Sequence, residues 1–167
     1  AWRARKNVDG PATWKVLRTG VVLAAIVAPI QIFVGDLHGL VALENQPAKI
    51  AAVEGIWETE KGAPLTLFGF PDEEARTTHF AIEVPKLASI ILTHHVDGEI
   101  KGLNEFEDAH PPVAPLFWSF RVMVGMGFLM LAVAWWGSYA LFRNKVGPWL
   151  LRALSWMTFA GWVASLA

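Results

Sequence analysis

Lys49 and Glu54 lie five positions apart in the stretch QPAKIAAVEGIWETE, residues 46–60. On a helix this spacing separates them by about 140°, so they would flank a ligand rather than pair with each other. Such a pair suits a quinol headgroup, because the lysine can hold one oxygen while the carboxylate accepts the proton of the other as electrons leave. The residues alone favour an ordinary solvated helix face, since charged side chains are common there.

A second chemical pair, Arg121 and Met123, lies in PPVAPLFWSFRVMVGMGF, residues 111–128. If this apolar segment spans a membrane, the arginine costs about 2.5 to 3.5 kcal/mol there and needs an interior partner, for which a haem propionate is suitable. The Met123 thioether could ligate a haem iron, which raises the reduction potential. The residues alone favour plain packing for Met123, because methionine commonly fills gaps in apolar interiors.

The remaining candidate ligands do not form a recognisable site. His94 and His95 are adjacent, so a helix would point them about 100° apart, and no third metal ligand accompanies them. The absence of cysteine excludes disulfides, thiolate metal sites and cysteine nucleophiles. The sequence also lacks a phosphate-binding glycine loop, a hydrolase triad, a zinc motif and a basic stripe for nucleic acid.

Three apolar segments must position these residues. The chain has 54% hydrophobic residues and nine tryptophans in 167 residues, which is typical of a membrane protein. The segment from Val16 to Val34 would be about 28 Å long as a helix, close to the hydrocarbon thickness, and Pro29 is expected to kink it. Residues 113–142 are long enough to cross with a tilt. A third apolar segment begins at Trp149.

Charged residues are sorted by segment. Basic residues dominate at both ends, whereas residues 35–112 hold fourteen acidic and five basic side chains. By the positive-inside rule the basic flanks are cytoplasmic and the acidic segment is outside. We therefore predict a cytoplasmic flank at 1–15, spans at 16–34 and 113–142, an outer segment at 35–112, a cytoplasmic turn at 143–148 and a truncated span at 149–167. Without an initiator methionine or signal-peptide pattern, the chain is expected to be an internal fragment.

The outer segment has its own pattern. A helix is predicted over 47–60, with Pro47 in its first turn and an apolar stripe of Ile50, Val53 and Trp57. The stretch GAPLTLFGFPDEE indicates a turn-rich connector, and FAIEVPKLASIILTHH a short amphipathic helix interrupted at Pro85. The expected fold is all-α: polytopic transmembrane helices with a partly helical outer loop. A loop of this length between spans is typically functional.

Several motifs resemble one membrane protein family. GDLHG, KIAAVEGIWET, LTLFGFPDEE, FAIEVPKLASII, VDGEIKGLNEF and VAPLFWSFRVMVGMGF occur in the order and approximate spacing of subunit I of cytochrome bd quinol oxidase. The similarity spans nearly the whole chain. It implies that residues 35–112 form the quinol-binding loop. Because GLNEF is followed almost directly by AHPPVAP, the chain resembles the short-loop branch, which includes cyanide-insensitive oxidases.

The resemblance implies roles for individual residues. Lys49 and Glu54 match the lysine and glutamate of the quinol loop, and Asp36 matches an aspartate at the start of that loop. Met123 matches the methionine ligand of the low-spin haem b, with Arg121 as its nearby arginine. The histidine ligand of that haem comes from an earlier helix in the family. In this sequence all five histidines lie outside the predicted spans: His38, His79, His94, His95 and His110.

The resemblance also implies a complex. The parent protein would be a multi-pass protein of the bacterial inner membrane that oxidises ubiquinol or menaquinol at its outer face and passes electrons through haem to oxygen. It would act with an oxidase subunit II and the remainder of subunit I, and would hold a high-spin haem b and a haem d besides the low-spin haem b. The alternative is a non-enzymatic membrane protein, such as a transporter piece or assembly subunit, whose acidic loop binds a partner.

Overall fold

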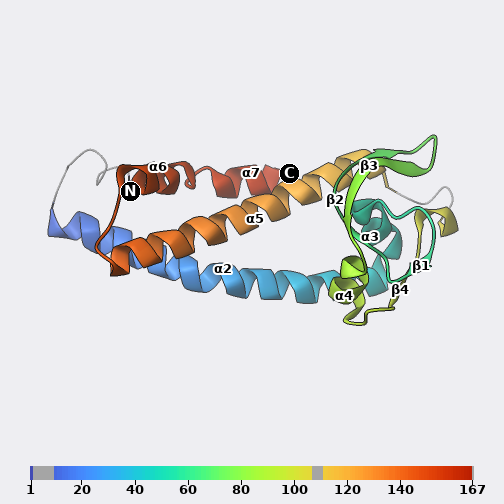
Figure 1. Ribbon diagram of the computed structural model, residues 1–167, viewed down its shortest axis with the longest axis horizontal. Helices are drawn as coiled ribbons and strands as arrows, with labels where there is room; N and C mark the ends of the chain where they lie inside the picture. The colour runs from blue at the N-terminus through green and yellow to red at the C-terminus, as the bar shows by residue number, and fades with distance from the viewer. Residues whose placement is uncertain (2–9, 107–110, 167) are drawn as a thin grey trace. The chain divides into compact units, whose positions relative to one another are not determined.

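The computed structural model describes residues 1, 10–106 and 111–166 (Figure 1). Most of the predicted cytoplasmic flank lies outside the described residues, as do His110 and Ala167. The chain divides into two compact units, one of residues 34–121 and one of residues 1–33 with 122–167.

The elements follow one another in a mostly helical chain. They are α2 (Pro11–Asn45), α3 (Pro47–Glu54), β1 (Glu60–Lys61), β2 (Leu65–Asp72), β3 (Thr77–Val84), α4 (Leu87–Thr93), β4 (Glu99–Ile100), the 3-10 helix η1 (Leu103–Glu105), α5 (Val113–Phe142), α6 (Pro148–Trp156) and α7 (Ala160–Leu166). The strands form two small antiparallel sheets, β1 with β4 and β2 with β3. All four strands belong to the predicted outer loop.

Two helices, α2 and α5, are long and apolar enough to cross a membrane among the residues that the structure describes. Only 6% and 11% of their most apolar windows are buried within the chain. Their exposed surfaces carry large apolar side chains such as Ile26, Phe33, Phe128 and Trp136. This surface is what the hydrocarbon of a bilayer would cover.

The first helix is longer than the predicted span 16–34. It begins at Pro11 and continues to Asn45, because residues 35–45 contain no proline and the helix tolerates Gly35 and Gly39. Pro29 lies inside α2, and its predicted kink stays a prediction. The helix ends one residue before Gln46, which precedes Pro47 and has an extended φ of −139°. A residue before proline disfavours helical geometry, so the proline sets this boundary.

The third apolar segment differs from the single helix expected from Trp149. It forms α6 and α7, with a turn between them at residues 157–159. In this turn the amides of Phe159 and Ala160 donate to the carbonyls of Trp156 and Met157, three residues back. These tight bonds replace the regular pattern of an α-helix. Neither helix alone has the roughly 20 residues that a span requires.

The outer loop is not all-helical, which corrects the expected all-α fold. The stretch predicted as a turn-rich connector contains β2, and the first five residues of the predicted amphipathic helix, 80–84, belong to β3. These strands pair from Leu65 with Val84 to Asp72 with Thr77. Alternating apolar and β-branched residues favour strands, and Asp72 Oδ1 closes the turn by accepting from the amides of Glu74 and Ala75, both at 3.0 Å.

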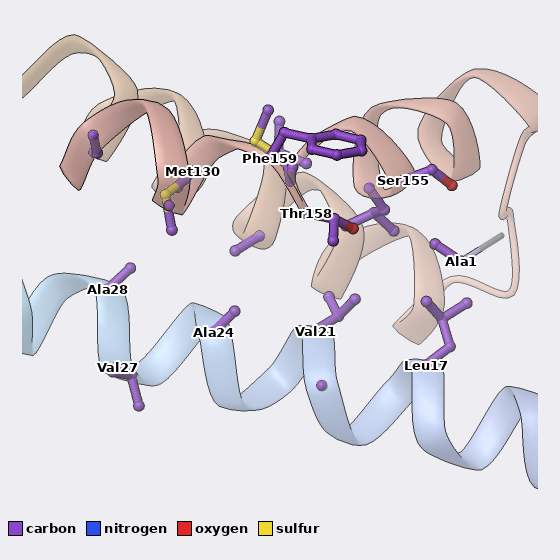
Figure 2. Close-up of a pocket in the computed structure, with 18 of the residues that line it drawn as sticks. Ala1, Leu17, Val21, Ala24, Val27, Ala28, Met130, Ser155, Thr158 and Phe159 are labelled. Atoms are coloured by element: carbon purple, nitrogen blue, oxygen red, sulfur yellow. The ribbon is translucent and has the colours of Figure 1, made fainter. Parts of the chain in front are cut away.

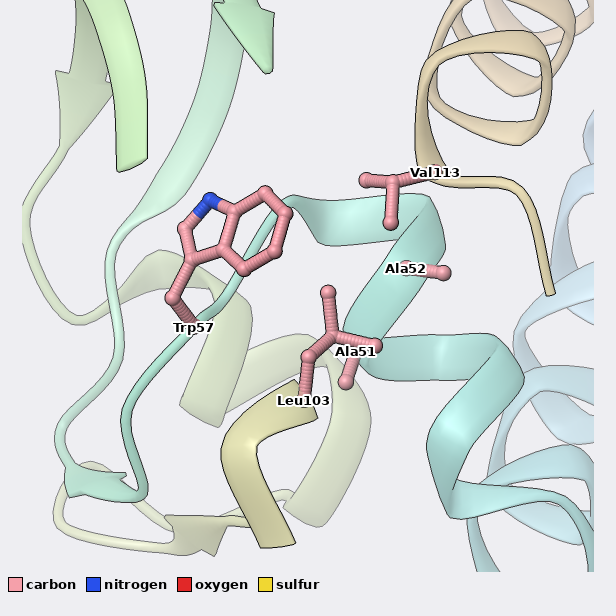
Figure 3. Close-up of a cluster of buried hydrophobic side chains, with 5 residues drawn as sticks. All are labelled: Ala51, Ala52, Trp57, Leu103 and Val113. Atoms are coloured by element: carbon pink, nitrogen blue, oxygen red, sulfur yellow. The ribbon is translucent and has the colours of Figure 1, made fainter. Parts of the chain in front are cut away.

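Helix α3 is shorter than predicted, because Gly55 ends it with a left-handed φ of 71°. The glycine also lies close to α5: an added Cβ would be 3.0 Å from the Phe117 ring. Trp57 therefore lies beyond the helix rather than on its stripe. It still packs into a buried cluster with Ala51, Ala52, Leu103 and Val113 (Figure 3).

Candidate functional site

Glu54 is the last residue of α3 and is buried, with 4% of its surface exposed. Its Oε2 lies 3.8 Å from Arg121 Nη2 and has no hydrogen-bond partner among the described residues. Burial raises the pKa of the Glu54 carboxyl from its usual 4.5 to about 7, and the Arg121 guanidinium offsets part of this increase. A carboxyl with this pKa exchanges protons near neutral pH, as a general base must.

Arg121 anchors the loop to the first turns of α5. Its Nη1 donates to the carbonyls of Val53 at 2.7 Å and Phe117 at 3.0 Å, and its Nη2 donates to the carbonyl of Thr66 at 2.5 Å. The guanidinium carbon lies 3.3 Å from the centroid of the Phe117 ring. The sequence predicted an interior partner for this charge, with a haem propionate as a suitable one. Within the described residues the guanidinium contacts Glu54 and backbone carbonyls from α3 and β2, and the propionate stays a prediction.

The start of α5 is held by the same loop. Glu73, in the turn between β2 and β3, accepts a hydrogen bond at 2.7 Å from the amide of Val113. A carboxylate at a helix N-terminus satisfies a free amide and complements the helix dipole. The aromatic rings of Phe68, Phe70 and Trp118 also meet here, with centroids 5.3 to 5.8 Å apart. Strand β2 is thus packed on the helix that carries Arg121.

Lys49 occupies a different environment from Glu54. Its side chain is exposed in the first turns of α3, and among the described residues it has no ion-pair partner. The lysine and the glutamate do not contact each other, in agreement with the predicted separation around the helix. The Lys49 ammonium thus faces solvent, whereas the Glu54 carboxyl is enclosed beside Arg121.

A small polar pocket of about 200 Å³ lies beyond the C-terminal end of α3. It is lined by Trp57, Thr66, Thr78, Glu60 and Glu83, among others. Trp57 Nε1 donates to Thr78 Oγ1, which in turn donates to the carbonyl of Gly55, both at 3.2 Å. Burial raises the pKa of the Glu60 carboxyl, with further increases from the nearby charges of Glu83 and Glu58.

Asp36 is placed beside a residue that the sequence did not connect with it. Its Oδ2 lies 3.2 Å from Nε2 of His94, at the C-terminal end of α4. Within the loop unit, α4 lies next to the C-terminal part of α2 (Figure 1). The structure thus brings Asp36 to a histidine, and among the described residues no hydrogen bond or ion pair joins either of them to Lys49. His94 and His95 form no metal site, and the described residues contain no group of three potential metal ligands.

Met123 belongs to the other unit, where it lines an apolar cleft of about 1430 Å³. Small side chains such as Ala24 and Ala28 of α2 form one wall, and Met130, Thr158 and Phe159 lie across from them (Figure 2). Met123 is 42% exposed. The cleft is larger than the roughly 300 to 1,000 Å³ of ordinary ligand pockets, so it has room for a large planar cofactor.

The residues of this cleft fit half of a haem site. A thioether, which can ligate haem iron, opens into an apolar cleft with walls of small residues. The residues that line the cleft include no histidine, so a histidine that helped to hold a haem here would have to come from outside this lining. Two further methionines, Met130 and Met157, line the same cleft. Geometry alone therefore does not single out Met123.

For several residues of the site, the sequence does not predict their position. Thr66 acts through its carbonyl oxygen, which leaves no trace in residue type. Thr78 and Glu83 belong to β3, whereas the sequence predicts a helix over 80–95, which includes Glu83, and assigns Thr78 to no element. His94 was considered only as a metal ligand. Two features of the sequence are consistent with its pairing: Asp36 follows the predicted apolar span 16–34, and His94 has no other assigned role.

The architecture is that of a helical membrane protein in which a folded loop presents a buried carboxyl to an arginine of a membrane helix. The family model described as cytochrome bd terminal oxidase subunit I matches residues 1–167. The chain belongs to this family.

Individual relatives agree with this assignment. The chain is 32% identical over 143 residues to a putative cytochrome bd menaquinol oxidase subunit I of Bacillus subtilis, covering 82% of this chain and 32% of the relative. It is 25% identical over 209 residues to cytochrome bd-II ubiquinol oxidase subunit 1 of Escherichia coli, covering 84% and 40%. The solved bd oxidase of Geobacillus thermodenitrificans matches with a TM-score of 0.65 and 33% identity, covering 90% and 37%. The chain spans about a third of the length of these relatives.

Proposed function

We propose that this chain is the quinol-oxidising part of a bacterial membrane quinol oxidase. The observation that carries the proposal is Glu54, a buried carboxyl with an unpaired oxygen and a pKa of about 7. It lies in a loop packed on a membrane helix of a cytochrome bd subunit I chain. Such a group is poised to take a proton from a quinol hydroxyl when electrons leave the ring.

Each loop residue has a distinct task in this proposal. The Lys49 ammonium donates a hydrogen bond to one quinol oxygen, and the Glu54 carboxylate accepts the proton of the other. The positive charge of Arg121 lowers the free-energy cost of ionising Glu54 in its buried position. Its hydrogen bond to the Val53 carbonyl also holds α3 in place. Asp36 contributes to the same quinol site from α2.

The membrane unit would receive the electrons. Met123 would help to hold a low-spin haem b through its thioether, together with a histidine from the remainder of subunit I. Haem provides one-electron transfer when bound. A high-spin haem b and a haem d would reside elsewhere in the complex and reduce oxygen.

The proposed topology follows from charge and hydropathy. Residues 35–112 face the outside of the bacterial inner membrane, since basic residues flank the spans on the other side. Helices α2 and α5 are two spans, and α6 with α7 forms part of a third. In this proposal the loop is of the short form, because GLNEF is followed almost directly by AHPPVAP in the sequence. Ubiquinol or menaquinol, subunit II and the remainder of subunit I are the proposed partners.

The test measures oxygen consumption by the complete complex, driven either by quinol or by an artificial donor that bypasses the loop. Glu54→Gln keeps the shape but removes the base, so the quinol-driven kcat should fall by about 10²-fold or more. Lys49→Ala should mainly raise KM, because the lysine binds substrate and transition state about equally. The artificial donor should still be oxidised at the wild-type rate.

Glu58→Gln is the matched control, because Glu58 is exposed four positions after Glu54. It should leave both activities unchanged. Equal loss of both activities in Glu54→Gln would indicate misfolding or loss of haem. Wild-type quinol kinetics in Glu54→Gln and Lys49→Ala would refute the proposed site.

A further inference from the structure

Oxidation of a quinol releases two protons, one from each hydroxyl at opposite edges of the ring. The proposed function gives one of them to Glu54. Lys49 cannot take the other, because an ammonium group has three donors and no acceptor. The second hydroxyl therefore needs a base that lies apart from Glu54, with the quinol ring between the two.

The contact between Asp36 and His94 has the chemistry of such a base. The two residues are 58 positions apart, and the ring Nε2 lies 3.2 Å from the carboxylate Oδ2. An ionised carboxylate only accepts hydrogen bonds, so Nε2 must carry the proton that it shares with Asp36. Nδ1 then has a free lone pair that can accept a proton, and the carboxylate stabilises the resulting imidazolium.

The position of His94 is fixed by its backbone. It is the residue at the C-terminal end of α4, with a left-handed φ of 55°, and its amide donates to the Ile90 carbonyl at 3.0 Å. The neighbouring Thr93 hydroxyl donates to the Ser89 carbonyl at 2.7 Å. A non-glycine residue in this conformation is uncommon and marks a constrained position. The backbone of His94 is thus held by the end of α4, and its ring contacts Asp36.

The dyad is also accessible from an apolar surface. The His94 side chain is 55% exposed and that of Asp36 is 30% exposed. Close to the two residues in sequence, Leu37 of α2 and Ile90 and Ile91 of α4 have exposed apolar side chains. A quinol carries its headgroup on a long apolar tail, so a proton acceptor at the border between apolar surface and a polar loop matches both parts of the molecule.

The other histidines of the described loop lack this combination. His79 lies 3.5 Å from Asp72, but on the β2–β3 turn, where both side chains are largely exposed. The side chains of His38 and His95 have no carboxylate within ion-pair distance among the described residues. Only His94 pairs with a residue that the family resemblance assigns to the quinol site.

We propose that His94 is the second proton acceptor of the quinol site, with Asp36 as its positioning residue. One quinol O–H bond breaks as its proton moves to Nδ1 of His94, and the other breaks as its proton moves to Glu54. The two electrons leave one at a time for the haem of the oxidase, and the ring becomes a quinone. Atoms and charge balance with two protons held on this chain, which then pass to the outer solvent.

The inference rests on the proposed function, so its test uses the same complete complex and both electron donors. In His94→Gln the amide nitrogen can still donate to Asp36, but the side chain cannot take a proton. The quinol-driven kcat should fall by about 10²-fold, the contribution of a general base, with little change in KM. Oxidation of the artificial donor should be unaffected. Asp36→Asn should lower kcat by a smaller factor, because the base remains but is poorly oriented.

Chemical rescue separates a proton acceptor from a structural contact. His94→Gly removes the ring, and glycine suits the left-handed backbone at this position. Added imidazole should restore quinol-driven turnover in this variant and have no effect on His94→Gln, in which the space is filled. His95→Gln is the matched control and should behave as wild type throughout.

The possible results distinguish the two hypotheses. Loss of quinol turnover in His94→Gln with imidazole rescue of His94→Gly establishes the second acceptor. If Glu54→Gln is impaired while His94→Gln keeps the wild-type kcat, the proposed function stands and the role of His94 is refuted. Lost turnover in both His94 variants without rescue, or with equal loss from the artificial donor, would assign His94 a structural role. Wild-type quinol kinetics in Glu54→Gln would overturn the proposed function itself.

Discussion

At the scale of single residues, the environment of each acid decides what it can do. Glu54 and Glu58 are four positions apart and identical in type, yet Glu54 is buried against Arg121 and Glu58 is exposed. A buried carboxyl is harder to ionise, because removal from water penalises its charged form. At 3.8 Å and without a direct hydrogen bond, the Arg121 guanidinium compensates only part of this cost. The result is a base suited to neutral pH.

A pH dependence follows from the Glu54 pKa of about 7. Below that pH the carboxyl already holds a proton and cannot accept another, so the quinol-driven kcat/KM should rise as pH increases through about 7. The folded state also prefers protonated Glu54, so this group's contribution to stability is present below pH 4.5 and is lost as pH rises through about 7. A steady-state pH profile measures the effect on activity.

The control for this prediction is Glu58→Gln, which should keep the wild-type profile. Glu54→Gln should lose the rising limb near pH 7, since no titrating carboxyl remains at the site. A limb that persists unchanged in Glu54→Gln would assign it to another group, and His94 would be the next residue to substitute.

At the scale of elements, the helical periodicity of α5 directs residues of two candidate sites to different sides of the helix. Arg121 and Met123 are two positions apart, so a helix points them about 200° apart around its axis. Arg121 faces the loop through its bonds to Val53 and Thr66, and Met123 opens into the apolar cleft. A continuous helix of 30 residues keeps both side chains at fixed angles.

The methionines of α5 provide a test at this scale. Met123 and Met130 are seven positions apart, or two turns, and line the same cleft. In the complete complex, Met123→Leu should weaken the low-spin haem band and lower its midpoint potential, because leucine keeps the volume but removes the sulfur ligand. Met130→Leu should leave the reduced-minus-oxidised spectrum as in the wild type. An altered spectrum only in Met130→Leu would assign the ligand to Met130.

At the scale of the whole molecule, charge and hydropathy act together. The apolar surfaces of α2 and α5 fit a bilayer, and the acidic loop between them is a folded unit with its own core of Ile56, Ala63, Ala88 and Ile100. The structure gives Ser89 a role in that core, where its Oγ accepts from the amide of Ala63 at 2.7 Å and donates to the Gly98 carbonyl at 2.8 Å. A compact loop of this kind can hold a substrate site outside the membrane.

The predicted topology can be tested by cysteine labelling, because the chain has no native cysteine. Glu74→Cys lies in the exposed turn between β2 and β3, and Asn144→Cys lies after the C-terminal end of α5. On intact cells an impermeant thiol reagent should label position 74 and not position 144. After the membranes are opened, both should react. Labelling of position 144 alone on intact cells would reverse the orientation.

Local patterns in the sequence determined the apolar helices, the acidic loop and the candidate residues Lys49, Glu54, Arg121 and Met123. These features are readable because hydropathy and helical spacing depend only on neighbours along the chain. Pro47 even set the end of α2 and the start of α3, although the residues between 35 and 45 continued the helix further than their polarity indicated. The family motifs then supplied roles that spacing alone left open.

Only the tertiary structure decided which distant residues meet. Arg121 reaches the Val53 carbonyl across 68 positions, and Asp36 reaches His94 across 58. No periodic pattern in the sequence predicts either contact, because each depends on how the β2–β3 hairpin and α4 pack against the helices. The burial of Glu54 is also a tertiary property, since a glutamate at the end of a short helix is ordinarily solvated. That burial changes its pKa, and with it the chemistry that an otherwise common side chain can perform.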